Sequence, residues 1–131
     1  MHKVLIVDDR PEIRRLLGKS LGQICEVLEA VDGESGLRMA REHLPTLMLL
    51  DVMMPGDLDG LQVLDAVKAD PLARHILVAM LTARGQVADR EDALARGADG
   101  YFIKPFSPAE VLCWVRDRLV KAAKPVDSTP R

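Results

Sequence analysis

Four short apolar runs, each followed by a polar or charged residue, constrain the fold of this chain more than any other feature. They cover Val4–Val7, Leu47–Leu50, Ile76–Leu81 and Tyr101–Ile103. Segments with helical spacing separate them. Short apolar runs in this setting are typical of parallel strands that are buried on both faces. The sequence therefore predicts an α/β fold in which helices cover both sides of a central sheet.

A fifth run, Cys25–Ala30, alternates more between apolar and polar residues, which favours a strand at an edge of the sheet. The segments between the runs predict five helices. These cover Pro11–Gly22, Asp32–Leu44, Leu61–Ala69, Val87–Arg96 and Ser107–Ala122. Five strands that alternate with five helices form a doubly wound parallel sheet with right-handed crossovers.

The length of 131 residues suits one domain with a single core. The last residues lack an apolar face and include Pro, Ser and Thr. We therefore expect one folded domain over residues 1–122, followed by a flexible tail or a linker stub over residues 123–131.

Charge and hydropathy argue against several classes of partner. A net charge of −2 gives no electrostatic reason to expect this domain to bind a nucleic acid or an anionic membrane. The longest apolar stretch, Ile76–Leu81, is far shorter than the roughly 20 residues of a membrane-spanning helix. A strand pattern follows the first residues directly, so we expect no secretory signal. Cys25 and Cys113 lack CxxC spacing, and we expect both to be buried free thiols of a cytoplasmic protein.

Polar residues follow the apolar runs at the points where the strands should end. Asp8 and Asp9 follow the first of the four runs, and Asp51, Thr82 and Lys104 follow the other three. The carboxyl ends of parallel strands share one edge of a sheet, where ligands bind. If the first and third strands are neighbours, their ends lie about 5 Å apart and three carboxylates crowd one spot. Taken singly, the paired Asp residues could cap a helix and Lys104 could be a solvated lysine, but together the five residues predict a site.

The residue types at this edge suit one kind of chemistry. Three carboxylates repel one another and raise at least one pKa unless a cation compensates. Oxygen-only ligands in a partly open site suit Mg²⁺, which keeps several waters and readily binds a phosphate oxygen. A carboxylate beside Mg²⁺ can attack phosphorus and form an aspartyl phosphate. Lys104 would then supply positive charge to the phosphoryl oxygens, and the Thr82 hydroxyl would donate a hydrogen bond.

Several short motifs, in this order and at these intervals, resemble the receiver domain of the two-component response regulators, of which the chemotaxis response regulator is one. The motifs are Asp8-Asp9, Asp51-Val52-Met53-Met54-Pro55, Asp59-Gly60, Thr82-Ala83, Gly97-Ala98-Asp99-Gly100-Tyr101 and Lys104-Pro105-Phe106. The resemblance extends from Lys3 to about Ala122. It implies a flavodoxin-like sheet with the strand order 2-1-3-4-5. It also implies a signalling switch, not an enzyme, with only self-phosphorylation and slow self-dephosphorylation.

By this resemblance, Asp51 accepts a phosphoryl group from a phosphohistidine on a sensor histidine kinase or a histidine phosphotransfer protein. Asp9, Asp51 and the backbone carbonyl of Met53 would bind Mg²⁺ directly. Asp8 would assist, often through water.

The resemblance gives further residues a role in switching. Thr82 and Lys104 would contact the bound phosphoryl group. Tyr101 has the family's aromatic switch position, outward in the inactive state and inward once Thr82 moves toward the phosphate. The family usually has a cis peptide bond before the proline at Pro105. The resemblance does not name the output partner or domain.

The resemblance also implies a partner-binding face beside the acidic edge. Arg10, Pro11 and Arg14 of the first helix would help to dock the phosphodonor, although an ordinary solvated helix face explains them equally well. Trp114 lies on the charged stripe of the last helix. There it either folds over the rim of the core or anchors a partner, since Trp is enriched in binding hot spots. The expected face comprises Arg10, Pro11, Arg14, Pro105, Phe106 and Trp114.

The chain departs from the family pattern in two places. The segment Pro55–Gly60 has one residue more than the usual motif, which predicts a changed loop shape but no loss of the site. In the branch of the family that is fused to winged-helix domains, charged pairs on the face of the fourth and fifth helices support dimers. Arg90 and Glu110 could form one of these pairs. Gly100 and Trp114, however, stand where charged residues are expected. We therefore expect a monomer or a phosphorylation-dependent dimer, and we expect the dimer of the winged-helix branch to be disfavoured.

The same residues are compatible with two other functions. A Mg²⁺-dependent phosphohydrolase would also use Asp51 as its nucleophile. Haloacid-dehalogenase-type enzymes, however, place a second Asp two residues later, where this chain has Met53. A binding module could keep the fold without ever being phosphorylated, but the complete set of site residues argues against it.

Overall fold

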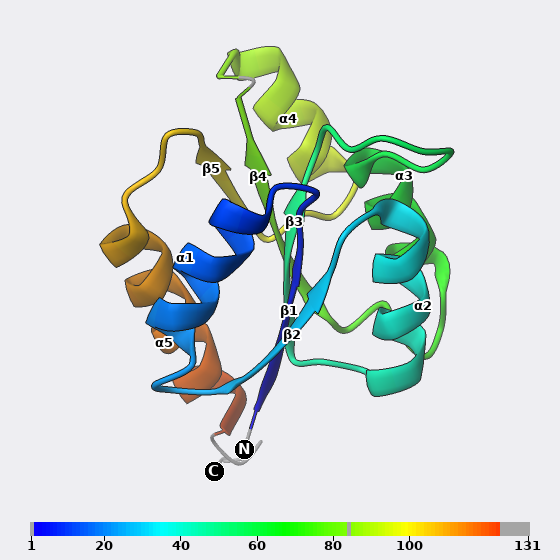
Figure 1. Cartoon of the computed structure of the whole chain (residues 1–131). Coiled ribbons are helices and arrows are strands. Elements are labelled where there is room, and N and C mark those ends of the chain that lie inside the picture. The colour runs from blue at the N-terminus through cyan, green and yellow to red at the C-terminus, as the bar shows by residue number, and fades with distance from the viewer. Residues whose placement is uncertain (1, 84, 124–131) are drawn as a thin grey trace, which may run out of the picture.

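The computed structural model describes residues 2–83 and 85–123, in which five strands alternate with five helices (Figure 1). The strands are β1 (Lys3–Val7), β2 (Glu26–Ala30), β3 (Leu47–Asp51), β4 (Leu77–Thr82) and β5 (Gly100–Ile103). The helices are α1 (Pro11–Leu21), α2 (Gly33–His43), α3 (Gly60–Ala69), α4 (Val87–Ala95) and α5 (Pro108–Ala123). Apart from Ala123, which ends α5, the expected tail lies outside the described residues. Within the described residues, no helix is both long and apolar enough to cross a membrane.

The sheet is parallel throughout and has the order β2-β1-β3-β4-β5. This confirms the doubly wound topology and the edge position of β2. Helices α1 and α5 cover one face of the sheet, and α2, α3 and α4 cover the other (Figure 1). Because all five strands run in one direction, the loops that follow them gather at a single edge.

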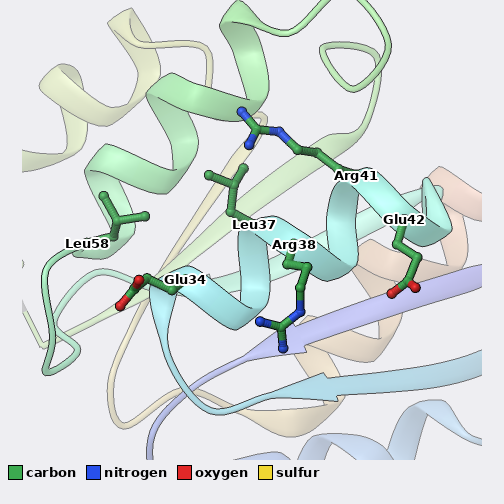
Figure 2. A pocket seen from close by; sticks show the side chains of 6 residues that line it. All are labelled: Glu34, Leu37, Arg38, Arg41, Glu42 and Leu58. Atoms are coloured by element: carbon green, nitrogen blue, oxygen red, sulfur yellow. The ribbon is translucent and has the colours of Figure 1, made fainter.

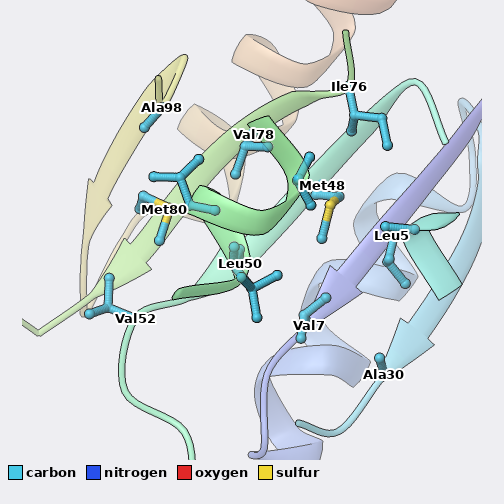
Figure 3. Packing of buried hydrophobic residues seen from close by; sticks show 14 of the residues in the cluster. Leu5, Val7, Ala30, Met48, Leu50, Val52, Ile76, Val78, Met80 and Ala98 are labelled. Atoms are coloured by element: carbon cyan, nitrogen blue, oxygen red, sulfur yellow. The ribbon is translucent and has the colours of Figure 1, made fainter. Parts of the chain in front are cut away.

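The central strands are buried on both faces, which explains why their sequences are continuous apolar runs. In β1, Leu5 and Val7 pack into the cluster beneath α2, α3 and α4 (Figure 3), whereas Val4 and Ile6 pack into the cluster beneath α1 and α5. Every residue of β3 is buried, including Asp51 at its end. The two apolar layers thus fix the strands whose ends carry the polar residues.

A capping box and a glycine bring the start of α3 against the end of β3. The Asp59 side chain accepts the backbone N–H of Gln62 at 2.9 Å, and the Gln62 side chain accepts the N–H of Asp59 at 2.9 Å. A Cβ atom at Gly60 would lie 2.1 Å from the carbonyl oxygen of Asp51. Only glycine therefore lets α3 begin so close to the residue that ends β3.

The structure corrects some details of the expectations. Several observed element ends differ by one residue from the expected ones; α5, for example, ends at Ala123. Cys25 is buried, as expected, but Cys113 is exposed. Val111 and Val115 of α5 face the sheet, and Cys113 lies between them on the opposite side of the helix, where it is exposed to solvent.

We expect Gly60→Ala to lower the free energy of unfolding by about 1–3 kcal/mol, because the added methyl group would overlap the Asp51 carbonyl and force a backbone shift. Urea unfolding would show a lower midpoint with an unchanged slope. Gly18→Ala in α1 is the control. Its Cβ would meet nothing closer than 3.9 Å, so its better helix propensity should leave stability equal or up to about 1 kcal/mol higher. Equal stability of Gly60→Ala and the wild type would contradict the close packing of α3 on β3.

Candidate functional site

The polar residues that follow four of the strands meet at the carboxyl edge of the sheet. Asp51 and Thr82 are the last residues of β3 and β4, and both are buried. Asp8 follows β1 and is fully buried, whereas its neighbour Asp9 is exposed. Lys104 follows β5, and its backbone N–H donates to the carbonyl of Thr82 at 2.7 Å. This bond ties the loop after β5 to the end of β4.

The ammonium group of Lys104 bridges two buried carboxylates. Its Nζ atom lies 2.9 Å from Oδ2 of Asp8 and 3.3 Å from Oδ1 of Asp51. The other oxygen of Asp8, Oδ1, accepts the backbone N–H of Arg10 at 2.9 Å. Oδ1 of Asp51 also accepts the backbone N–H of Met53, at 3.4 Å. Each buried carboxylate thus has one charged partner and one backbone partner, which offsets part of the desolvation penalty.

The environment of Asp51 disfavours its charged form. Burial, and then the nearby Asp8 carboxylate, raise the pKa of Asp51 to about 6, although Lys104 and the Met53 N–H offset part of the rise. At neutral pH Asp51 is therefore mostly ionised, but its negative charge is destabilised. A second positive charge at this point would stabilise the ionised form.

Three carboxylates form a donor set that fits a hard divalent cation. One oxygen from each of Asp8, Asp9 and Asp51, here called the carboxylate cluster, lies within 4.8 Å of the others. Lys104 supplies one positive charge against three negative ones, so the cluster keeps an excess of negative charge. All its donors are oxygens and Asp9 is open to solvent, which suits Mg²⁺ with several retained waters.

A surface hollow of about 390 Å³ adjoins the carboxylate cluster on the side of the loop after β3. Asp9, Met53 and Asp59 line it together with Val52, Met54 and Pro55. Met53 and Asp9 therefore border the same space, as the predicted metal site requires. Two of the lining residues, Pro55 and Asp59, belong to the segment Pro55–Gly60, which is one residue longer than the usual family motif.

A second hollow, of about 370 Å³, lies on the other side of Lys104, between α1 and the loop after β5. It is lined by Arg10, Ile13, Leu16, Lys104, Pro105 and Phe106. The Lys104–Pro105 peptide bond is cis, as the family resemblance implied. Ile13 and Leu16 were not among the partner-face residues expected from the sequence, yet they line this hollow. Leu17 is buried and Leu16 is 43% exposed. The sequence did not indicate which of the two faces the core, because adjacent helical residues can both be buried, as Val63 and Leu64 are in α3.

Arg14 does not line this hollow. Its Nη1 atom donates to the backbone carbonyl of Asp8 at 2.8 Å, and its Nε atom donates to Oε1 of Glu29 in β2 at 3.1 Å. The Arg14 side chain is only 16% exposed. Its guanidinium is thus directed toward the loop after β1 and toward β2.

The two aromatic residues singled out from the sequence take different places. Tyr101 in β5 is half-buried against the cluster beneath α2, α3 and α4. Trp114 in α5 is also half-buried and meets Phe102 edge-on, with ring centroids 5.8 Å apart. A Cβ atom at Gly100 would lie 2.7 Å from the Trp114 ring, and the Arg118 guanidinium carbon lies 4.6 Å from its centroid. The Trp114 ring therefore folds over the rim of the core, which is one of the two positions expected from the sequence.

A further hollow, of about 550 Å³, lies between α2 and the loop that precedes α3 (Figure 2). Leu37 and Leu58 line it together with the charged residues Glu34, Arg38, Arg41 and Glu42. It contains no member of the carboxylate cluster and was not predicted from the sequence. Its lining combines charges of both signs with two leucines.

Sequence comparison finds one family model and a set of curated relatives. The model for the response regulator receiver domain matches residues 4–116. "Probable transcriptional regulator ycf27" of Cyanophora paradoxa is 44% identical over 128 residues, which cover 97% of this chain and 52% of that protein. "Phosphate regulon transcriptional regulatory protein PhoB" of Klebsiella pneumoniae is 40% identical over 116 residues, with coverage of 88% and 50%. The chain spans about half the length of these relatives.

Structure comparison gives the same result. The BeF3-activated receiver domain of DrrB matches with a TM-score of 0.83 and 29% identity, covering 92% of this chain and 98% of that one. The chemotaxis protein CheY4 of Vibrio cholerae matches with a TM-score of 0.82 and 30% identity, covering 89% and 98%. Both matches extend over nearly the whole described sheet and its helices.

We expect Asp51→Asn to stabilise the metal-free protein at neutral pH, because it removes a buried negative charge. The pKa of Asp51 is higher in the folded chain, about 6, than its ordinary value of 3.8, so the folded state binds the proton more tightly. The contribution of Asp51 to wild-type stability should therefore fall as pH rises from about 4 through 6, by about 2–3 kcal/mol in total. Urea unfolding in EDTA should show Asp51→Asn more stable above pH 7, and the difference should shrink toward pH 4. A difference that is independent of pH would contradict the raised pKa.

Proposed function

The chain belongs to the response regulator receiver family, and from this premise we propose that it is a phosphorylation-controlled switch with Asp51 as the phosphoacceptor. The observation that carries the proposal is the bridge from Lys104 to Asp8 and Asp51 at the carboxyl edge of the sheet. It supports a site in which a carboxylate is held beside positive charge and beside further oxygen ligands. We propose a cytoplasmic location and a histidine kinase or histidine phosphotransfer protein as the donor.

The proposed reaction is an in-line transfer from a phosphohistidine of the donor. An oxygen of the ionised Asp51 carboxylate forms a bond to phosphorus while the P–N bond to the donor imidazole breaks. The electron pair of that bond returns to the imidazole nitrogen. The pKa of Asp51, at about 6, leaves most of the carboxylate ionised and ready to attack at neutral pH.

The residues of the carboxylate cluster would hold Mg²⁺, with Asp9, Asp51 and the Met53 carbonyl as direct ligands and Asp8 as a supporting one. When bound, Mg²⁺ would neutralise charge on the phosphoryl oxygens. Lys104 would leave its place between Asp8 and Asp51 to pair with the phosphoryl group. The division into direct and supporting ligands is what the family resemblance implies, and the clustering of the three carboxylates supports it.

The switch would use groups that are tied to the edge of the sheet. A phosphoryl group adds between one and two negative charges at Asp51 and attracts Thr82 and Lys104. Full conversion of a two-state element from 1:99 to 99:1 requires about 5.5 kcal/mol, whereas one charged hydrogen bond contributes about 1.5–3 kcal/mol. Phosphorylation alone would therefore shift Tyr101 and the face around β5 only partly, and an output partner or a further domain would complete the shift.

A Mg²⁺-dependent phosphohydrolase is the alternative. Such an enzyme needs a general acid close to the nucleophile, and the position two residues after Asp51 is Met53, which has no proton to donate. The neighbouring carboxylate, Asp8, is paired with Lys104 and accepts the Arg10 N–H, so it is held as an acceptor. The site therefore favours a stable acyl phosphate over repeated turnover.

Incubation with acetyl phosphate and Mg²⁺ should add one phosphoryl group to the chain, as measured by mass spectrometry of the intact protein. Asp51→Asn should abolish the gain, because it removes the nucleophile. Asp57→Asn, an exposed carboxylate in the same loop, is the matched control and should label like the wild type. Omission of Mg²⁺ should slow labelling strongly. Sustained phosphate release from an unrelated ester, without a stable adduct, would favour the hydrolase.

The hollow between α1 and the loop after β5 is the proposed docking site for the donor. Its apolar lining residues Leu16 and Phe106 share the hollow with Lys104, whose ammonium group lies 3.3 Å from the phosphoacceptor Asp51. Arg10 adds positive charge at its border. A partly exposed apolar patch with a basic rim suits the side of a helix that carries a phosphohistidine.

We expect Leu16→Ala and Phe106→Ala each to reduce phosphotransfer from a cognate histidine kinase about tenfold, because anchors in a binding hollow contribute more than about 1 kcal/mol. Labelling by acetyl phosphate should not change, since this small donor does not need the hollow. Leu72→Ala is the control, because Leu72 is 72% exposed and lies outside the hollow. Equal losses with both donors would indicate damage to the acceptor site and not to docking.

A further inference from the structure

We propose that Arg14 is a positioning residue, which holds the loop after β1 so that Asp8 and Asp9 converge on Asp51. This inference rests on the proposed function, because it assigns Arg14 a role in the metal-dependent step of the same site. It differs from the role expected from the sequence, in which Arg14 faces an approaching phosphodonor.

The geometry of Arg14 supports a structural link between three elements. The residue lies on α1, donates through Nη1 to the carbonyl of Asp8 at 2.8 Å, and donates through Nε to Glu29 of β2 at 3.1 Å. The planar guanidinium presents its donors in a fixed fork, so two simultaneous bonds define its position closely. With 16% of its side chain exposed, Arg14 is shielded by the elements that it connects.

The bond to the Asp8 carbonyl completes the set of contacts around that residue. The N–H of Asp8 donates to the carbonyl of Ala30 at 3.2 Å, and its two carboxylate oxygens accept the Arg10 N–H and the Lys104 ammonium. Arg14 binds the remaining polar group, the carbonyl. That carbonyl belongs to the peptide plane between Asp8 and Asp9, so its direction determines where the Asp9 side chain begins.

The bond from Arg14 to the Asp8 carbonyl matters most for Asp9, because Asp9 is exposed. Asp8 is buried and held by several partners, but Asp9 is open to solvent at the start of a loop. A rotation of the peptide plane between them would move the Asp9 carboxylate away from Asp51. Groups that orient a metal ligand without touching the metal typically change metal affinity or activity by about 10–100-fold when removed.

The test compares Mg²⁺ binding by isothermal titration calorimetry in the full chain and its variants. Arg14→Met should weaken Mg²⁺ binding at least about tenfold. Arg15→Met is the matched control, because Arg15 is the next residue on α1 and is exposed; it should bind Mg²⁺ within twofold of the wild type. Glu29→Gln should have a smaller effect than Arg14→Met, since the bond to the Asp8 carbonyl remains.

A second readout separates positioning from docking. At limiting Mg²⁺, Arg14→Met should label slowly with acetyl phosphate, and saturating Mg²⁺ should restore most of the rate. Arg14→Lys keeps a cationic donor on α1 but lacks the guanidinium fork, so it should recover part of the Mg²⁺ affinity; this variant also covers the case in which Arg14→Met fails to fold. Wild-type Mg²⁺ affinity in folded Arg14→Met, or a loss in Arg14→Lys as large as that in Arg14→Met, would overturn the proposal.

The outcome for Arg14 is distinguishable from the outcome for the switch itself. If the wild type binds Mg²⁺ but gains no phosphoryl group, the proposed function fails, while the ratio of Mg²⁺ affinities still decides the role of Arg14. If the wild type is labelled and Arg14→Met loses only transfer from the protein donor, Arg14 is a docking residue and the positioning role is wrong.

Discussion

The contact of one ammonium group with two buried carboxylates is the interaction on which the site at the carboxyl edge of the sheet depends. Lys104 approaches Asp8 to 2.9 Å and Asp51 to 3.3 Å, and these residues follow or end β5, β1 and β3. Two buried anions without a cation would repel each other and lose their hydration. The lysine therefore links an edge strand to the two strands at the centre of the sheet. It also leaves the carboxylate cluster with an excess of negative charge, which is the property that suits a divalent cation.

The apolar layers explain how such a cluster is maintained. β1 and β3 are buried on both faces, so their register cannot shift by one residue without placing apolar side chains wrongly. Gly60 lets α3 pack directly onto the carbonyl of Asp51, which further restricts the end of β3. The free energy that holds the carboxylates together thus comes mainly from burial elsewhere in the sheet.

Much of this could be predicted from the sequence, because apolar runs define buried parallel strands and parallel strands align their ends. The order of the sheet and the identity of the clustered residues followed from those two facts and the family motifs. The directions of helical side chains did not follow. Leu16 and Cys113 are exposed, and Arg14 turns toward Asp8, because neighbouring positions on a helix compete for one apolar face and only tertiary packing decides among them. For the same reason the sequence left open whether the Trp114 ring packs on the rim of the core or is exposed. Its ring packs against Gly100, where a side chain would leave no room for it.

The packing of Trp114 has a consequence for the way in which the site could communicate with the rest of the molecule. Gly100 and Phe102 of β5 both contact the Trp114 ring, and Tyr101 lies between them on the opposite face of the strand. β5 leads directly to Lys104, the group that would move toward a phosphorylated Asp51. A rigid aromatic contact transmits a shift of β5 to α5, whereas a flexible charged side chain at position 114 would absorb it. Under the proposed function, a shift of β5 that accompanies a movement of Lys104 would therefore also reach α5 through the Trp114 ring.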